Sequence, residues 1–453
     1  MIRTWSLIWL AAAVGGMAIM VFAYRQAADA SGSSGGGRVL FVAKQPEAKA
    51  GVGSPVSVHF LLPADDAVET LANAFGGTDR ELAESFRQNH QQMVILRPDF
   101  EQWFAENMLA SGRLPEAGAK EVLADPQSSS QAPIRVGDET LQVVGVLKNA
   151  DSLHLNACYA ADDPAMREML EKNGTKLTGG YLISRDDLHK VKEIDKQFPY
   201  KQFSTIVHSP RMKKADFYNY VLGTLLFLLG GSGLLVRLYI FAAGRSRETW
   251  IGAPLGEISR HWKLFSLLHA VYFGLFITGA LVIYDAPLIQ DLLSTAIRGQ
   301  IQSGSGVLGT VGQAYESRNI AVAAITTVAI NFFLGSLMVI TLPSIVVPGI
   351  GVLMAVFRAT VWGVLLAATS LALARGMIFH TGTLLLEGEG YILAAFFGLL
   401  VPIYLFSPGE GETAWGRYRK AVVMNLKGNL LVLAVLAAAA LYEAIEVIFQ
   451  MGG

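Results

Sequence analysis

Long stretches without charged residues fill the second half of the chain, and another lies near its start. Residues 5–24 form an uncharged run that is long enough to cross the roughly 30 Å hydrocarbon core of a membrane. Six further apolar stretches predict spans at residues 217–236, 264–284, 319–342, 349–374, 377–406 and 428–449. The pattern predicts a polytopic α-helical bundle of about seven transmembrane helices.

Two of these spans have alternative interpretations. Residues 28–30 (Ala-Asp-Ala) resemble a signal-peptide cleavage site, but the apolar core before them is longer than signal peptides usually have, which favours an uncleaved anchor. The fifth span follows Pro343 and Pro348 in a stretch without charge. These prolines mark either a tight hairpin or a re-entrant segment.

Between the first two spans the pattern changes to that of an α+β domain. Strand-like segments occur at residues 39–43, 56–62 and 94–96, and residues 134–136 and 141–146 flank a Gly-Asp hairpin signal. Helices are expected at residues 66–91 and 100–109. The predicted organisation is an anchor (1–24), a linker (25–37), an extracytoplasmic α+β domain (38–216), two spans with a basic loop (217–306) and a C-terminal bundle (307–453).

The charged residues support this division. Residues 1–216 hold 49 of the 73 charged residues, so the remaining 237 residues hold only 24. Basic residues of the second part gather in two predicted loops: Arg245, Arg247, Arg260 and Lys263 in one, Arg417, Arg419, Lys420 and Lys427 in the other. Because short basic loops remain in the cytoplasm, seven spans place both loops inside. The expected location is the inner (cytoplasmic) membrane, with the N-terminus cytoplasmic and both residues 25–216 and the C-terminus extracytoplasmic.

Composition also narrows the chemistry. A net charge of -1 gives no broad field for nucleic acid, and the single cysteine, Cys158, permits no internal disulfide or thiolate cluster. The chain contains no Gly-x-x-x-x-Gly-Lys-Ser/Thr phosphate loop. No nucleophile–base pair, metal site or cofactor motif is present in the sequence, so we expect that the protein is not an enzyme.

Ionisable residues inside predicted spans are the main candidates for function, because each costs free energy unless it is paired or hydrated. The candidates among them are Arg358, His380, Glu387, Glu389 and Glu443, and Glu446 receives a lower weight because it lies toward the outer interface. A cation at Arg358 facing Glu387 would offset part of both costs. Such a pair is either a structural clamp or a relay for protons or substrate, and Gly388 and Gly390 mark a place where the helix could unwind.

The extracytoplasmic domain resembles that of a known transport family. Gly112-Arg113-x-Pro115, then Glu121-Val122-Leu123 and a hairpin ending in residues 143–146 are similar to the periplasmic core domain of MacB-type ABC permeases, which also follows the first span. The loop after the second span resembles the segment by which that family docks a separate ATPase. The resemblance implies docking through Arg245, Arg247, Glu248, Trp250, Ile258 and Arg260, although Pro254 departs from the family pattern. The alternative is an ordinary basic anchor at the membrane surface.

Residues 310–450 resemble a second family, the stage II sporulation protein M family of membrane bundles. Asn319, Gly335, His380 with Glu387, and the segment at 439–444 carry this resemblance. The interval from His380 to Glu387 is longer than in the family, so Glu387 and Glu443 are the better correspondences. This family acts in wall remodelling, and some of its relatives are permease-like.

Two classes of function follow. In the first, the chain is a permease-like subunit of an ABC-type export or envelope-transport system with a separate ATPase. In the second, it is a non-transporting scaffold that recruits envelope or wall-remodelling proteins. Membrane lipid is a partner in both, and the sequence leaves a homo-oligomer open.

Overall fold

The protein divides into two compact units, which we describe separately. One unit consists of Met1–Arg25 and Met212–Gly453, and the other of Gln26–Arg211. A computed structural model describes residues 2–32, 38–43, 54–61, 92–97, 109–124, 134–136, 139–147, 157–172, 176–184, 203–206, 212–246, 248–286, 290, 293–294, 297, 301, 306–407 and 413–452.

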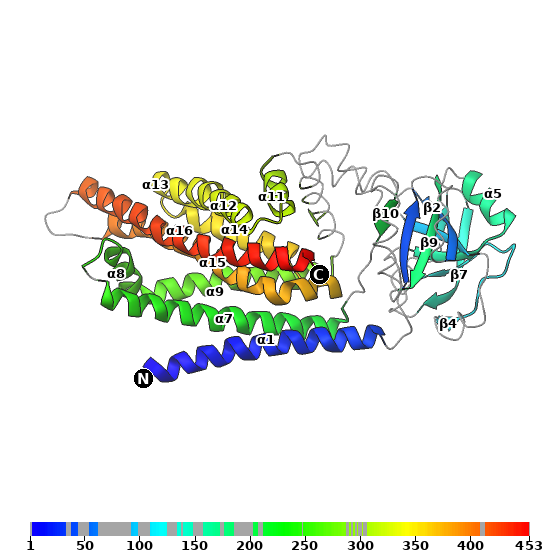
Figure 1. The fold of residues 1–453 in the computed structure, drawn as a ribbon, viewed down its shortest axis with the longest axis horizontal. Coiled ribbons are helices and arrows are strands. Elements are labelled where there is room, and N and C mark those ends of the chain that lie inside the picture. The colour runs from blue at the N-terminus through cyan, green and yellow to red at the C-terminus, as the bar shows by residue number, and fades with distance from the viewer. Residues whose placement is uncertain are drawn as a thin grey trace. The chain divides into compact units, whose positions relative to one another are not determined.

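The Gln26–Arg211 unit is built on one ten-stranded sheet (Figure 1). Its strands are β1 (Arg38–Ala43), β2 (Ser54–Leu61), β3 (Gln92–Arg97), β4 (Leu109–Gly112), β5 (Glu121–Ala124), β6 (Ile134–Val136), β7 (Glu139–Leu147), β8 (Ala157–Ala161), β9 (Lys176–Ser184) and β10 (Phe203–Ile206). The order is β10-β1-β9-β2-β3-β8-β5-β7-β4, and β6 pairs with β7. The pairs β3–β8 and β5–β7 are parallel, while the other pairs are antiparallel.

Helix α5 (Pro164–Lys172) closes the core of this unit on the β3, β5 and β8 side of the sheet. Its residues Met166, Met169 and Leu170 are buried with side chains from these strands. Cys158 on β8 belongs to the same core and is fully buried.

The predicted strands all coincide with observed ones, and the Gly-Asp signal joins an antiparallel hairpin of β6 and β7. The predicted helix at residues 66–91 lies outside the described residues. Of the predicted helix at 100–109, only Leu109 is described, and it begins β4. Gly112 ends this strand at φ 87°, and a Cβ there would lie 2.3 Å from the Val144 carbonyl oxygen, so only glycine fits.

The other unit is helical. It contains α1 (Ile2–Gly32), α7 (Lys214–Arg245), α8 (Gly252–Arg260), α9 (Trp262–Tyr284), α11 (Gly306–Glu316), α12 (Ile320–Ala329), the π-helical η3 (Ile330–Thr341), α13 (Leu342–Val346), α14 (Ile350–Leu365), α15 (Leu371–Phe406) and α16 (Ala414–Gly452). Asn319 caps α12 by accepting from two backbone amides, and the Ser370 hydroxyl caps α15.

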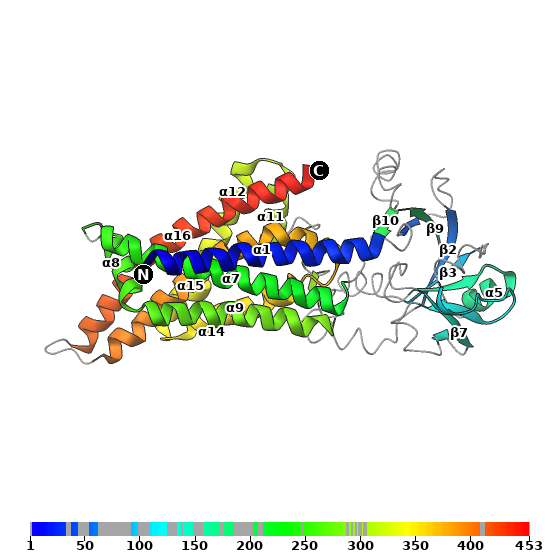
Figure 2. The ribbon, with the colours of Figure 1, turned by 90° about the horizontal axis from the view of Figure 1, so that it is seen from below.

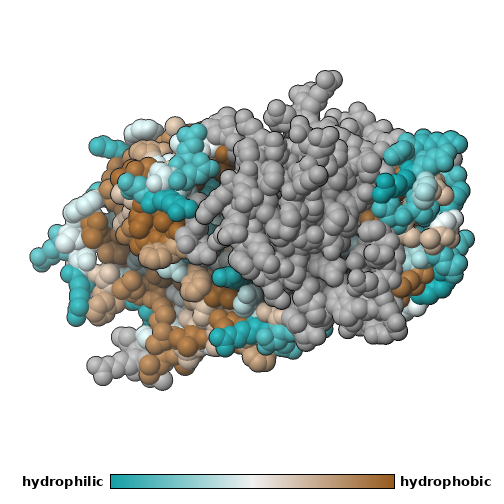
Figure 3. All heavy atoms as spheres, turned by 45° about the vertical axis from the view of Figure 1, so that its right-hand side comes forward, coloured by the Kyte–Doolittle hydropathy of each residue, from teal (hydrophilic) through white to brown (hydrophobic). Residues whose placement is uncertain are grey.

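Six of these helices are long and apolar enough to cross a membrane. They are Trp5–Asp29, Lys214–Arg245, Trp262–Tyr284, Ile320–Val346, Leu373–Phe406 and Ala414–Phe449. Hydrophobic side chains gather over the described surface of this unit (Figure 3). The protein is therefore a multi-pass helical membrane protein.

Helix α14 is shorter than the predicted fifth span. It has 16 residues, so at 1.5 Å per residue it is about 24 Å long. The chain leaves the helix at Leu366 and re-enters one at Leu371, whereas the sequence predicted a continuous span at residues 349–374. The apolar run continues through this break, so hydropathy alone does not reveal it.

Hydrogen bonds locate the two ends of α14. Before the helix, the Ile345 carbonyl accepts from the Tyr418 hydroxyl at 3.0 Å. After it, the Thr369 carbonyl accepts from the backbone amide of Met212, next to the start of α7. The start of α16, which carries Tyr418, and the start of α7, which follows Met212, lie at opposite ends of the bundle (Figure 1). Helix α14 therefore carries the chain from one end of the bundle to the other.

Two further boundaries differ from the sequence prediction. The predicted linker at residues 25–37 is helical through Gly32, because Gln26, Ala27 and Ala28 favour a helix, while residues 33–37 lie outside the described residues. The basic segment from Arg417 to Lys427 is not a loop but the first turns of α16.

Helix α1 is packed into the bundle. It runs beside α7 in both views (Figures 1 and 2). Glycines allow this approach, because a Cβ at Gly16 would lie 2.4 Å from the Phe227 amide nitrogen and one at Gly230 2.4 Å from that of Ala13. Met20 is fully buried in the same contact region, beside Gly223.

Candidate functional site

One face of α15 carries a polar stripe through the bundle. His380, Thr383, Glu387 and Tyr391 follow one another at intervals of three or four residues, which places them on the same side of the helix. The helix is continuous from Leu371 to Phe406, so the predicted unwinding at Gly388 and Gly390 is wrong. These glycines instead admit close neighbours: a Cβ at Gly388 would lie 3.0 Å from the Phe273 ring, and one at Gly390 would lie 2.5 Å from Leu436.

Arg358 on α14 pairs with Glu387 in the middle of this stripe, as the sequence suggested. Its Nη2 donates to Glu387 Oε1 at 3.0 Å and to the Tyr391 hydroxyl at 2.6 Å, and that hydroxyl donates to the same carboxylate oxygen at 2.8 Å. The guanidinium lies 4.0 Å from the centre of the Tyr391 ring. The side chains of the pair are 25% and 18% exposed, so most of their surface is removed from solvent.

Helix η3 approaches this pair through a glycine. A Cβ at Gly335 would lie 3.0 Å from the Tyr391 hydroxyl oxygen and 3.4 Å from Arg358 Nη1. A larger residue would therefore press on both groups. Arginine does not lose its proton in proteins, so Arg358 presents a fixed positive charge to Glu387. Its Nε has no hydrogen-bond partner among the described residues.

The part of the stripe nearest the start of α15 carries a second group of ionisable residues. His380 Nδ1 lies 3.4 Å from Glu446 Oε1 on α16, and the Thr383 hydroxyl donates to Glu446 Oε2 at 2.9 Å. Glu443 lies within electrostatic reach of His380, Glu446 and Glu387. The structure thus brings together His380, Glu387 and Glu443, and it adds Glu446, to which the sequence gave a lower weight.

Glu389 faces the opposite side of α15, toward α9. Its Oε2 lies 2.6 Å from Nε2 of His269, whose Nδ1 lies 2.8 Å from the backbone oxygen of Phe265. Both side chains are almost completely buried, at 0% and 2% exposure. Phe265 packs edge-on against the imidazole at 4.6 Å between ring centres, and Phe273 lies on its other side at 6.4 Å.

His269 was not among the residues predicted from the sequence. The signal was available, because a histidine inside the apolar stretch 264–284 is an ionisable group within a span. What the sequence did not show is that residues 269 and 389, which are 120 positions apart, meet across two helices.

A third buried polar group joins η3 to α16 and was also missed. The Thr341 hydroxyl donates to Asn429 Oδ1 at 3.0 Å, and Asn429 Nδ2 donates to the Asn425 carbonyl at 3.0 Å. Asn425 and Asn429 are buried at the helical spacing of four residues.

The predicted docking segment is a short helix at one end of the bundle. Helix α8 packs against α7 and contacts α16, so the two basic segments lie at the same end. Leu255 and Ile258 are buried against the bundle. The prediction that Ile258 contacts a partner is therefore wrong, because its side chain is not accessible. Trp250 remains 63% exposed, and the Arg260 side chain is 68% exposed while it pairs with Glu257 at 3.0 Å.

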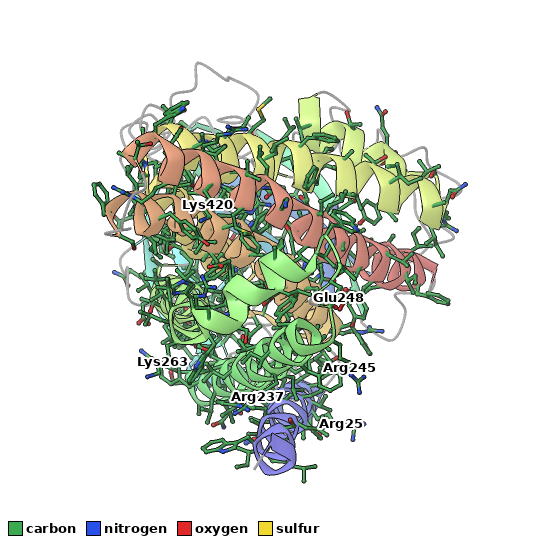
Figure 4. The ribbon with its side chains drawn as sticks, turned by 90° about the vertical axis from the view of Figure 1, so that its left-hand side faces the viewer. Arg25, Arg237, Arg245, Glu248, Lys263 and Lys420 are labelled. Atoms are coloured by element: carbon green, nitrogen blue, oxygen red, sulfur yellow. The ribbon has the colours of Figure 1, made fainter. Side chains whose placement is uncertain are left out.

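Figure 4 views the bundle from this end and labels four of its charged residues. Arg245, Glu248, Lys263 and Lys420 are all exposed. Arg245 stacks on the Phe241 ring at 4.2 Å. Arg247 lies outside the described residues. The exposed part of the predicted docking segment therefore consists of Arg245, Glu248, Trp250 and Arg260.

The described residues do not gather three histidine, cysteine or acidic side chains in a group that could hold a metal ion. Comparison with known proteins identifies no relative: no family model, no curated protein and no solved structure matches this chain.

Proposed function

We propose that the protein is a permease-like integral membrane subunit of an ABC-type export or envelope-transport system, driven by a separate ATPase. The observation that carries this proposal is the set of ionisable and hydrogen-bonding side chains collected inside the bundle. Arg358, Glu387, His269, Glu389 and Glu443 lie on helices that meet one another between the two ends. A bundle that only anchors a scaffold needs no such groups, and each costs several kcal/mol in lipid unless it is paired.

Helix α8 supports the second part of the proposal. It is held to the bundle by buried residues and presents Trp250 and Arg260 outward. It continues through His261 into α9, so that a force applied to α8 reaches the interior of the bundle. Exposed tryptophan and arginine side chains are typical anchors of a protein interface.

The proposal includes a topology of seven passes. Helix α14 counts as a pass because it joins the two ends of the bundle despite its length. The basic end then faces the cytoplasm, together with the N-terminus. The sheet unit and the C-terminus are extracytoplasmic, in the inner membrane, and α1 remains as an anchor because it is packed against α7.

Affinity purification of the full chain from its native membrane tests the ATPase partner. We expect an ATP-hydrolysing protein to copurify with the wild type and with Trp415→Ala, and to be lost with Trp250→Ala. Trp415 is the matched control, because it is 71% exposed at the same end of the bundle but lies on α16.

The competing function is a non-transporting scaffold for envelope or wall-remodelling proteins. Copurification of wall enzymes alone, unchanged by Trp250→Ala, would favour the scaffold and contradict the permease proposal. The proposal assigns no catalytic chemistry to this chain.

A further inference from the structure

The two carboxylates in the middle of α15 have partners of different chemical character. Glu387 is paired with an arginine, which keeps its proton, whereas Glu389 is paired with a histidine, which exchanges its proton near neutral pH. The first contact therefore fixes a charge, and the second contact has a titratable group on both sides.

Hydrogen-bond partners define the protonation state of the second pair. A backbone carbonyl only accepts, so Nδ1 of His269, 2.8 Å from the Phe265 oxygen, must carry a hydrogen. The 2.6 Å contact between Nε2 and Glu389 Oε2 needs a hydrogen as well. This hydrogen gives either an imidazolium with a carboxylate or a neutral imidazole with a carboxylic acid. In both cases the pair holds one bridging proton and has no net charge.

Loss of that proton would remove the hydrogen bond between His269 and Glu389. A neutral Nε2 lone pair would then face a buried carboxylate, and Glu389 Oε1 already has no hydrogen-bond partner among the described residues. An unpaired charge at this depth is strongly unfavourable. Release of the proton therefore requires α9 and α15 to separate at this position.

The surroundings of the pair are mostly aromatic. The titratable groups near it are the Tyr239 hydroxyl from α7, within electrostatic reach of Glu389, and Tyr272 on α9. Beyond Tyr272 lie Arg358 of α14 and Glu387 of α15. Phe265, Phe273 and Phe396 complete the described environment, and the α16 residue beside Gly390 is Leu436.

We propose that His269 and Glu389 form an intramembrane binding site for one exchangeable proton, and that binding and release of this proton make and break the contact between α9 and α15. On release the proton passes to water, no electrons are transferred, and one negative charge remains on Glu389. Glu387, two residues before Glu389, is paired with Arg358, whose charge is fixed. This pair acts as a clamp between α14 and α15 rather than as a relay for protons.

The inference deepens the proposed function, because α9 follows directly on α8. His269 lies seven residues after the first residue of α9, about 10 Å along the helix axis. A movement of α8 would therefore act on the histidine side of the contact. Proton binding itself does not require the ATPase, so the inference is tested on this chain alone.

The test is a pH titration of His269 by side-chain ¹⁵N NMR, with the full-length chain in lipid nanodiscs and histidine labelled. The His269 signal is assigned by its absence in His269→Gln. The titration runs from about pH 5 to about pH 10, beyond the range in which histidines ordinarily titrate, because the bridging proton is released only when α9 and α15 separate. We expect one transition in which the Nε2 signal changes, because Nε2 loses either its own hydrogen or the hydrogen bond from the protonated carboxyl group, while Nδ1 keeps its hydrogen.

Glu389→Gln and Glu387→Gln form the matched pair of variants. The glutamine amide at 389 can donate to Nε2 without a titrating proton, so His269 should remain neutral across the range and the transition should be lost. In Glu387→Gln, the same change two residues away, the transition should persist. A constant His269 signal in the wild type, or a transition that persists in Glu389→Gln, would overturn the proposal.

Infrared spectroscopy keeps the test decisive if Glu389→Gln does not fold. The infrared band of the Glu389 carboxyl or carboxylate group, identified as the band that changes in His269→Gln, should change in intensity or frequency with rising pH in the wild type, because the bridging proton leaves either the carboxyl group itself or its hydrogen-bonded imidazolium partner. A band that stays constant over the same range would equally overturn the proposal. Neither measurement includes an ATPase, so failure here leaves the purification experiment to decide the proposed function.

Discussion

At the scale of single residues, the bundle separates charges that are fixed from charges that titrate. Arg358, Glu387 and the Tyr391 hydroxyl are joined to one another by hydrogen bonds. His269 and Glu389 instead share one hydrogen between two side chains that both exchange protons. Two carboxylates separated by a single residue therefore have different chemical roles, because they face different helices.

The Arg358–Glu387 contact predicts a non-additive pair of substitutions. Glu387→Gln should destabilise the bundle by on the order of 3 kcal/mol, because it leaves a largely buried guanidinium without its counter-charge. Arg358→Gln should have a comparable effect, and the double variant should recover part of the combined loss. Thermal unfolding of the four proteins in one detergent measures the coupling. Strictly additive losses would show that the two side chains do not stabilise one another.

Outside the membrane, Glu121 predicts an acid-dependent stability of the sheet unit. Arg113 donates to both of its carboxylate oxygens, at 2.8 and 2.5 Å, and the Glu116 amide donates at 3.1 Å. The hydrogen bonds from Arg113, and then the one from Glu116, lower the pKa of Glu121 below its ordinary value of 4.5. A lowered folded-state pKa stabilises the fold above 4.5, and this contribution is lost as the pH falls through the folded-state pKa.

Glu121→Gln should therefore lower the unfolding temperature of the sheet near neutral pH and weaken its dependence on acid. The effect should be small, because the Arg113 side chain is 51% exposed. Infrared amide bands of the full chain follow the sheet during heating. Glu168→Gln, on the exposed face of α5, is the control and should unfold as the wild type does. Identical acid dependence in Glu121→Gln and the wild type would refute this account.

The two ion pairs of the candidate site differ in how far they could be predicted from the sequence. Arg358 and Glu387 could be paired from the sequence, because each is expensive in a membrane and opposite in charge. His269 and Glu389 could not be matched, because nothing in the sequence indicates which faces of α9 and α15 meet. Ile258 failed as a docking residue for a similar reason: burial depends on packing that its local sequence does not contain.

At the scale of secondary structure elements, glycines determine how closely the helices approach. A Cβ at Gly363 on α14 would lie 2.1 Å from the backbone oxygen of Phe276 on α9, and one at Gly279 would lie 2.8 Å from that of Thr360. These two glycines allow α14 to pack closely against α9. The same helix, α14, carries Arg358, whose partner Glu387 lies on α15.

Gly363→Ala should thus destabilise the bundle by about 1–3 kcal/mol, because the methyl group forces α14 away from α9. Gly274→Ala on α9 is the matched control, since a Cβ there meets nothing within 4 Å. Alanine also has the higher helix propensity, so this variant should be at least as stable as the wild type. Unfolding in detergent compares the two. Equal stability of both variants would contradict the close approach of α9 and α14.

Most elements could be predicted from the sequence, because their apolar runs or alternation are long. The fifth span was the exception. Its apolar run continues from α14 into α15, while the helix ends at Leu365 and restarts at Leu371. The Ser370 cap was the readable signal for that restart. The glycines at 388 and 390 were misinterpreted as a break, because glycine serves close packing as well as unwinding.

At the scale of the whole molecule, the proposed topology predicts which positions reagents reach from each side. In a Cys158→Ala background, an impermeant maleimide should label Glu171→Cys in right-side-out membrane vesicles. Trp250→Cys should be labelled only in inside-out vesicles, because α8 lies at the basic end. Both residues are exposed in the structure. Labelling of Trp250→Cys from the outside would contradict the proposed orientation and indicate the opposite one.

The proposed function connects the exposed Trp250 and Arg260, which flank and end α8, with the buried polar groups of the bundle. If the chain is a permease-like subunit, ATP hydrolysis by its partner must respond to a change in the membrane interior. A scaffold would bind its partners through exposed surfaces and would not transmit such a change.

The most direct measurement is the rate of ATP hydrolysis by the purified complex in nanodiscs. We predict that Glu389→Gln lowers this rate severalfold while the complex stays intact, and that Glu316→Gln, an exposed residue at the end of α11, leaves it unchanged. An intact complex whose rate is the same with Glu389→Gln as with the wild type would contradict the account.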